Sequence, residues 1–207
     1  MSYGVLYAVR PHRITGPIRW RQLAPVVAVA AAAFVAACGD PTSLKASLAT
    51  QTDTLVSYAL TGTPPGYPAA LNTVFRSVVR IDANFNFDVA FDLDTAGNVR
   101  LIPVNMMGGI ATSNRRVGIQ KSDQLFEGLT RAPASGYTYD TVTVVKPGDA
   151  VSVQVTASDQ CAFSISNLLY SRIGIDSVNS ATRTIYFRTT HDPNCGFRSF
   201  LPGLPKN

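Results

Sequence analysis

Apolar and polar residues alternate along most of the chain after residue 53, the period-two pattern of strands that bury one face. In the clearest run, 85–94, one face carries Phe85, Phe87, Val89, Phe91 and Leu93, and the other face carries Asn86, Asp88, Ala90, Asp92 and Asp94. A turn sequence at 95–98 follows, and apolar residues resume over 99–104. The pattern therefore predicts a β-hairpin over 85–104.

Two further hairpins are predicted by the same pattern. In the first, 137–145 returns through 151–155 across the turn Lys146-Pro147-Gly148-Asp149, where Pro followed by Gly is typical of a type II turn. In the second, 168–178 returns through 183–190. Alternation also predicts strands over 54–61 and 76–81.

Helix signals are confined to one short segment, in which Ser122 would cap a helix over 123–127 that Gly128 ends. Residues 62–70 and 105–116 carry Pro or Gly and predict irregular loops, which are the segments where scaffolds usually place contacts. About eight short strands and one short helix predict an all-β domain over 53–207, an antiparallel β-sandwich. A partly open β-barrel is the alternative.

The first 38 residues carry a different pattern. Arg10, Arg13, Arg19 and Arg21 precede a 15-residue apolar run over 23–37, which ends in Val35-Ala36-Ala37-Cys38. This order is the design of a secretory signal peptide, and the run is shorter than the roughly 20 residues that a transmembrane helix needs. Val-Ala-Ala-Cys in this place resembles the lipobox of bacterial lipoproteins.

That resemblance implies three segments: a signal peptide over 1–37, a flexible tether over 38–52 and the domain over 53–207. It also implies cleavage before Cys38, a diacylglycerol on the Cys38 sulfur and commonly a further acyl chain such as palmitate on its amino group. The membrane would then be reached through lipid on Cys38. Gly39, rather than Asp, follows the cysteine, which under the sorting rule of this family favours the outer membrane of the cell envelope.

The net charge of the chain is lower once the first 37 residues are left out. The full chain has 18 Lys+Arg and 13 Asp+Glu, a net charge of +5. Four of the arginines and no acidic residue precede Cys38, so the rest of the chain has 14 basic against 13 acidic residues. A nearly neutral domain offers little to neutralise phosphates, and we expect no nucleic-acid partner.

The two remaining cysteines, Cys161 and Cys195, flank the predicted 168–190 hairpin. An even pair in an exported chain indicates a disulfide. The alternative is a metal site formed by Cys161, His191 and Cys195, which lacks a Cys-x-x-Cys pair and a clear fourth ligand. We therefore expect a disulfide and no metal or other cofactor.

Catalytic signals are few. After Cys38 the chain has one histidine, His191, and one glutamate, Glu127, with no Gly-x-Ser-x-Gly motif. We therefore expect no catalytic residue and a non-enzymatic envelope protein, which binds a ligand or a partner or has a structural role. An exported hydrolase that uses His191 or a pair of aspartates is the first alternative.

The second alternative is a calcium- or glycan-binding module. The segment from Asp92 to Gly97 resembles the first half of an EF-hand loop, but Ala96 and Pro103 stand where oxygen ligands belong; otherwise Asp88, Asp92 and Asp94 are a solvated polar face. Tyr137 and Tyr139 share one face of a predicted strand and could stack on a sugar ring.

Overall fold

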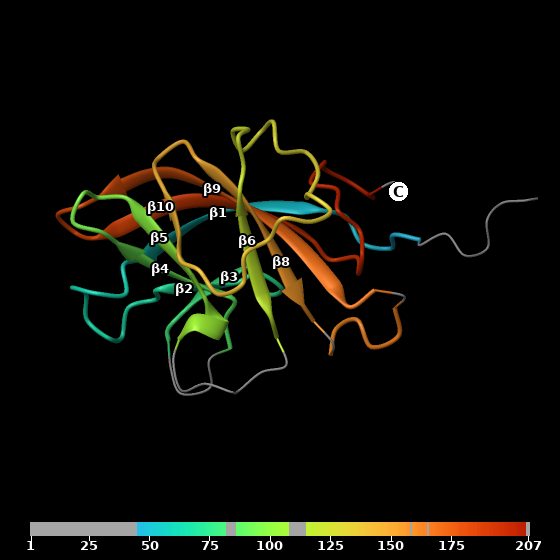
Figure 1. Ribbon diagram of the computed structural model, residues 1–207, viewed down its shortest axis with the longest axis horizontal. Helices are drawn as coiled ribbons and strands as arrows, with labels where there is room; N and C mark the ends of the chain where they lie inside the picture. The colour runs from blue at the N-terminus through green and yellow to red at the C-terminus, as the bar shows by residue number, and fades with distance from the viewer. Residues whose placement is uncertain (1–44, 82–85, 108–114, 158, 165, 206–207) are drawn as a thin grey trace, which may run out of the picture. The chain divides into compact units, whose positions relative to one another are not determined.

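The computed structural model describes residues 45–81, 86–107, 115–157, 159–164 and 166–205 (Figure 1). Within them, ten strands form two antiparallel sheets of five strands each. The predicted signal peptide and Cys38 lie outside the described residues. Among the described residues, no helix is long and apolar enough to cross a membrane.

The two sheets are stacked face to face as a β-sandwich, as the alternation predicted, with the long strands β9 and β10 drawn above β4 and β5 in Figure 1. In order, the first sheet consists of β1 (Gln51–Tyr58), β10 (Thr184–Asp192), β9 (Leu168–Asn179), β8 (Ala150–Thr156) and β6 (Val117–Lys121). The second consists of β3 (Ser77–Val79), β2 (Ala70–Asn72), β4 (Val89–Leu93), β5 (Val99–Pro103) and β7 (Thr143–Val145).

The core fills the space between the sheets with the apolar face of each strand. Phe91 of β4 and Phe187 of β10 are both completely buried, and their ring centroids are 4.7 Å apart across the two sheets. Val, Ile and Leu side chains from the neighbouring strands surround them in one continuous cluster. Burial of this surface is the main force that holds the two sheets together.

Two of the three predicted hairpins are confirmed, β4–β5 and β9–β10. The third is wrong, because β7 pairs with β5 of the second sheet whereas β8 pairs with β6 and β9 of the first. The turn between them has the predicted geometry: the Asp149 N–H donates to the Lys146 carbonyl, and Gly148 has φ of +92°. This turn forms a corner between the sheets rather than the tip of a hairpin.

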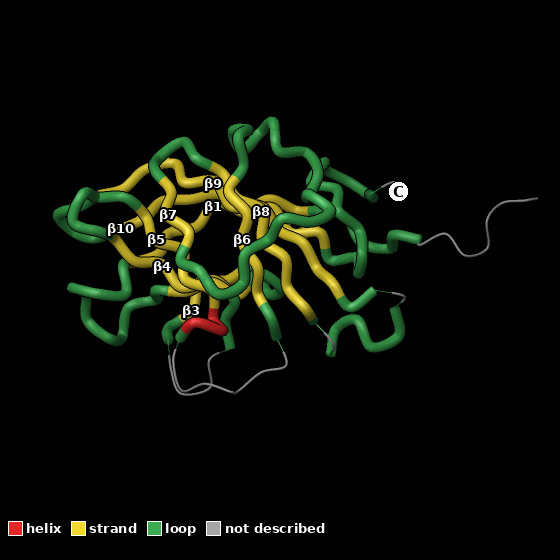
Figure 2. Tube along the Cα trace, in the orientation of Figure 1, coloured by secondary structure: helices red, strands yellow, loops and turns green. Residues whose placement is uncertain are grey.

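The predicted helix over 123–127 is also wrong. Ser122 does accept a hydrogen bond from the Gln124 N–H, but the segment closes only one turn, with the Leu129 N–H donating to the Leu125 carbonyl. Phe126 and Leu129 instead pack with Phe200 in a second apolar cluster, on the face of the first sheet that points away from the core. These covering loops are drawn in green in Figure 2; among the described residues, the one helical segment is the 3-10 turn Val104–Met106.

Gly174 on β9 permits this covering layer to approach the sheet. A Cβ atom at position 174 would lie 2.6 Å from Cδ2 and 2.9 Å from Cβ of Phe126. Gly174→Ala is therefore expected to lower the free energy of unfolding by about 1–3 kcal/mol, the usual range for overpacking. Gly66 is the matched control, because a Cβ there meets no atom within 4 Å. Urea unfolding that gave the two variants equal stability would contradict this packing.

The N-terminal boundary of the domain differs from the expectation. Residues 47–52 were assigned to the tether, yet the N–H groups of Ser47 and Leu48 donate to Oδ1 of Asn194, at 2.9 and 3.1 Å. Thr50 also forms a bridge with Gly203, and β1 begins at Gln51. The fixed part of the chain therefore begins at about residue 47 rather than at 53.

Cys161 and Cys195 form a disulfide, with their Cα atoms 5.8 Å apart. The bond joins the β8–β9 loop to the segment after β10, which is the pairing expected from their positions on either side of the β9–β10 hairpin. It excludes both cysteines from the alternative metal site with His191.

Candidate functional site

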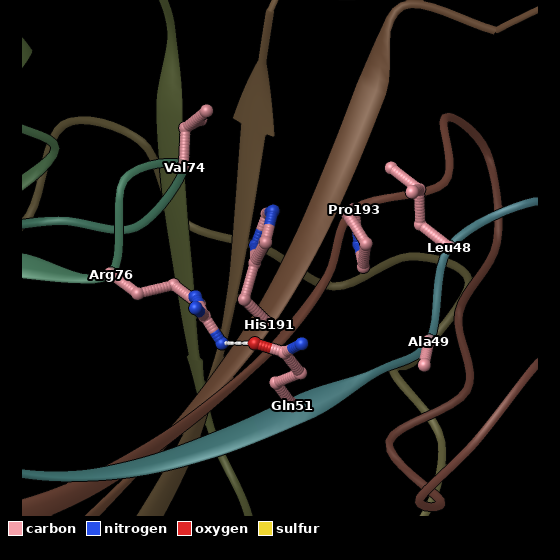
Figure 3. Close-up of a pocket in the computed structure, with 7 residues that line it drawn as sticks. All are labelled: Leu48, Ala49, Gln51, Val74, Arg76, His191 and Pro193. Atoms are coloured by element: carbon pink, nitrogen blue, oxygen red, sulfur yellow. Dashed lines mark hydrogen bonds between the residues drawn. The ribbon is translucent and has the colours of Figure 1, made fainter.

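The best candidate site is a pocket at the end of the sandwich where β1 begins and β10 ends. It has a volume of about 220 Å³ and is lined by Leu48, Ala49, Gln51, Val74, Arg76, His191 and Pro193. Figure 3 shows the His191 ring standing between Arg76 on one side and Leu48 and Pro193 on the other. The pocket therefore presents three nitrogen-bearing side chains, Gln51, Arg76 and His191, together with the apolar side chains of Leu48, Val74 and Pro193.

The position of His191 follows from the strand register. His191 lies on the same face of β10 as Phe187, which points into the core, and it is opposite Gln51 of β1 and Ser171 of β9. Its Nδ1 is hydrogen-bonded to Ser171 Oγ at 2.9 Å. His191 is thus an interior residue at the end of the core, and only 3% of its surface is exposed.

Burial lowers the pKa of His191 to about 4, and the positive charges of Arg76 and Arg115 act in the same direction. The ring is therefore neutral at pH 7. Arg76 supplies the cationic part of the pocket; its Nη1 is 3.3 Å from an Asp53 carboxylate oxygen and also donates to Gln51 Oε1 (Figure 3). A small group that carries an acid and some apolar surface would match this lining.

The His191–Ser171 pair bears on the hydrolase alternative. A nucleophilic serine needs a base within hydrogen-bonding reach, which His191 provides, and it must also meet the substrate. Ser171 is only 1% exposed and faces the core of the sandwich, so a substrate in the pocket would meet His191 before it reached the hydroxyl. This geometry is that of a buried structural hydrogen bond.

The aspartates in and next to β4, Asp88, Asp92 and Asp94, were expected on a solvated face, and that expectation is wrong for Asp88 and Asp92. Asp88 is fully buried, accepts hydrogen bonds from the backbone and hydroxyl of Thr73, and pairs with Arg115 at 2.8 Å. Burial raises the pKa of Asp88, whereas Arg115 and the Thr73 hydrogen bonds oppose that rise.

Asp92 is buried in a similar arrangement, with Thr61 and Arg183 as its partners at 2.8 and 3.2 Å. Asp94 instead closes the β4–β5 turn, because its carboxylate accepts from the Ala96 and Asn98 N–H groups. No three His, Cys, Asp or Glu side chains of the described residues are grouped so that they could hold a metal ion. The aspartates therefore act as structural partners within the described part of the chain.

The two tyrosines considered for glycan stacking lie on a segment that runs beside β6, ahead of the strand where they were predicted. Tyr137 donates or accepts a hydrogen bond with Ser152 Oγ at 2.8 Å, and the Tyr139 hydroxyl donates to Gln154 Oε1. Arg116 lies over the Tyr139 ring at 4.1 Å. Both hydroxyls are thus bonded within the protein, and one face of Tyr139 is covered.

Sequence reasoning identified His191 but not its surroundings. Leu48, Gln51 and Arg76 are more than 100 residues from His191 along the chain, and no local motif links them. Of the two loops expected to carry contacts, 62–70 is described, whereas 108–114 of the second loop lies outside the described residues.

No protein-family model, no curated protein and no solved structure matches this chain.

Proposed function

We propose that this protein is a lipid-anchored lipoprotein of the cell envelope, whose β-sandwich binds a ligand or a partner and does not catalyse a reaction. The observation that carries the proposal is the order of arginines, a 15-residue apolar run and Val35-Ala36-Ala37-Cys38. Acyl chains on Cys38 would hold the domain at a membrane surface, because each buried methylene contributes about 0.8 kcal/mol and two or more chains make attachment stable. The outer membrane is the favoured location.

The Cys161–Cys195 disulfide supports the export part of the proposal. Disulfides form and persist in oxidising compartments outside the cytosol and are rare within it. A domain with a disulfide between two separate loops is suited to the oxidising compartment in which an exported lipoprotein folds.

The binding part rests on the pocket beside Arg76 and His191. Arg76, His191 and the apolar side chains of Leu48 and Pro193 line it, whereas the buried Ser171 does not. Such a lining can hold a small group in place, and an envelope protein or a glycan that carries such a group is the kind of partner we expect.

Metabolic labelling with palmitate tests the anchor. When the full chain is made in a bacterial host, we expect the wild type to incorporate the label and its mature mass to begin at a modified Cys38. Cys38→Ser is expected to lose the label completely, because the sulfur that initiates acylation is absent. The matched control is the double variant Cys161→Ser/Cys195→Ser, which should keep it. An unlabelled wild type that retains Met1, or that has a free Cys38 thiol, would refute the anchor.

A fluorophosphonate that reacts with activated serines tests the hydrolase alternative. We expect no adduct on Ser171, because its hydroxyl is 1% exposed and bonded to His191. Trypsin in the same reaction would be the positive control. An adduct at Ser171 that disappears in His191→Ala would show a working nucleophile and base, and would replace binding with catalysis.

A further inference from the structure

The chain enters the domain at one firmly held point. Oδ1 of Asn194 accepts hydrogen bonds from the N–H groups of Ser47 and Leu48, and its Nδ2 donates to the Leu48 carbonyl at 2.8 Å. The Thr50 N–H donates to the Gly203 carbonyl at 2.9 Å. In Figure 1 the described chain accordingly begins on the same side of the sandwich as the C-terminal segment. The described chain therefore starts on this side of the sandwich.

Exposed apolar side chains lie on the segments that are linked to that point. Phe163 is fully exposed and Phe75 is 63% exposed, although large aromatic side chains are usually at least partly covered. Three leucines nearby are also more than half exposed. We call this set the entry rim; it comprises Leu48, Phe75, Phe163, Leu201 and Leu204.

Contacts along the chain and in space link the members of the entry rim into one region. Leu48 and Val74, the neighbour of Phe75, line the same pocket. The Cys161–Cys195 disulfide ties the loop of Phe163 to the residue next to Asn194, which holds Leu48.

The two C-terminal leucines belong to the same region. They flank Gly203, whose carbonyl is bonded to Thr50. The rim is therefore formed by four separate segments that meet where the chain enters the domain.

We propose that the entry rim rests on the lipid bilayer, with its aromatic and leucine side chains inserted among the headgroups. This proposal depends on the proposed anchor, because lipid on Cys38 is what would bring a membrane next to the rim. From Cys38 to Ser47 there are nine residue steps, and a fully extended chain of this length spans at most about 30 Å. The acyl chains of Cys38 therefore keep the rim within that distance of the membrane surface.

Because the domain is tethered to the membrane, weak contacts between the rim and the lipid are enough to dock it. A linked second site binds at a high effective concentration, so a few inserted side chains can dock the domain although they would not bind vesicles firmly on their own. Two exposed basic residues lie close to the rim along these segments: Lys45 is three residues before Leu48, and Arg131 forms a β-bridge with Ser199, two residues before Leu201. Basic residues next to a bilayer are attracted to anionic lipids, which favours the same orientation.

Single tryptophans introduced as fluorescent probes provide the test. Trp20 is the only tryptophan of the sequence, and cleavage of 1–37 removes it, so each introduced indole is observed alone. The lipidated protein would be reconstituted in vesicles of phosphatidylethanolamine and phosphatidylglycerol, with and without brominated acyl chains. The rim variants are Phe163→Trp and, if that one fails to fold, Phe75→Trp. The matched control is Tyr67→Trp, at a half-exposed site in the loop beyond the other end of β1.

In attached protein, we expect the indole at position 163 to emit at shorter wavelength and to lose intensity to brominated lipid. The indole at position 67 should show neither change. Attached protein in which both indoles behave alike would overturn the docking and leave the anchor intact. Protein that carries no lipid and does not float with the vesicles would overturn the anchor, and the docking with it. A shift at position 163 that occurs in native envelopes but not in lipid vesicles would assign the rim to a protein partner and refute the bilayer contact.

Discussion

Replacing Phe187 by alanine is expected to lower the free energy of unfolding by about 3–5 kcal/mol, the range measured for large buried aromatic residues. Phe187 is completely buried, and its ring lies against Phe91 of the opposite sheet with 4.7 Å between centroids. Removing the ring loses buried apolar surface and an aromatic pair, and it leaves a cavity between the sheets. Because both sheets line that cavity, neither can close it without shifting against the other.

Tyr186 is the matched control, since it is adjacent in sequence, aromatic and 41% exposed on the other face of β10. Tyr186→Ala should change stability by about 0.5 kcal/mol or less, as surface substitutions usually do. Urea unfolding followed by circular dichroism would measure both variants, since no described residue is a tryptophan. Equal losses for the two variants would show that the sheets are not held together through this ring pair.

Elements joined by local turns could be predicted from the sequence. The β4–β5 and β9–β10 hairpins each consist of two alternating runs around one turn, so neighbours along the chain are also neighbours in the sheet. The same logic failed for β7 and β8, although both strands and their turn exist. A type II turn does not match the twist of a two-residue hairpin, which favours type I′ or II′. The turn at Lys146–Asp149 therefore signalled a change of sheet.

The failed helix has a different cause. A capping Ser122 and a terminal Gly128 are local signals, but the residues between them are held by distant partners. Arg172 of β9 is almost fully buried and donates to the carbonyls of Phe126 and Leu129. These tertiary bonds, together with the packing of Phe126 on Gly174, replace the hydrogen bonds that a helix would make.

Burial of the polar face of β4 could not be read from its alternation. A period of two shows that Asp88 and Asp92 share a face, but the loops that cover this face come from elsewhere in the chain. Arg115 and Arg183 supply the opposing charges, and Thr73 and Thr61 supply hydroxyl donors. The same holds for the candidate site. His191 can be identified in the sequence, but the residues that form the pocket around it come from distant segments and are brought together only by the fold.

Lowering the pH from 7 to 4 is expected to reduce the stability of the fold through His191, by about 3 kcal/mol. The unfolded chain has the ordinary histidine pKa of 6.5, whereas burial and the charges of Arg76 and Arg115 lower it to about 4 in the folded protein. Between these values the unfolded state binds more protons than the folded state. The contribution of His191 to stability is therefore fully present above pH 6.5 and is lost as the pH falls toward 4. One pKa unit corresponds to about 1.4 kcal/mol, which gives the stated magnitude.

His191→Gln isolates this contribution, because glutamine does not titrate and can still bond to Ser171. Burial raises the pKa of Asp88 and Asp192, and these acids stabilise the folded state as they gain protons, opposite in sign to His191. Both acids remain in the variant, so their effect cancels when the two proteins are compared. The difference in unfolding free energy between wild type and His191→Gln should therefore shift by about 3 kcal/mol from pH 7 to pH 4. Parallel curves would mean that His191 is solvated in the folded protein, and that the pocket beside it is more open than the contacts of Arg76 and Ser171 imply.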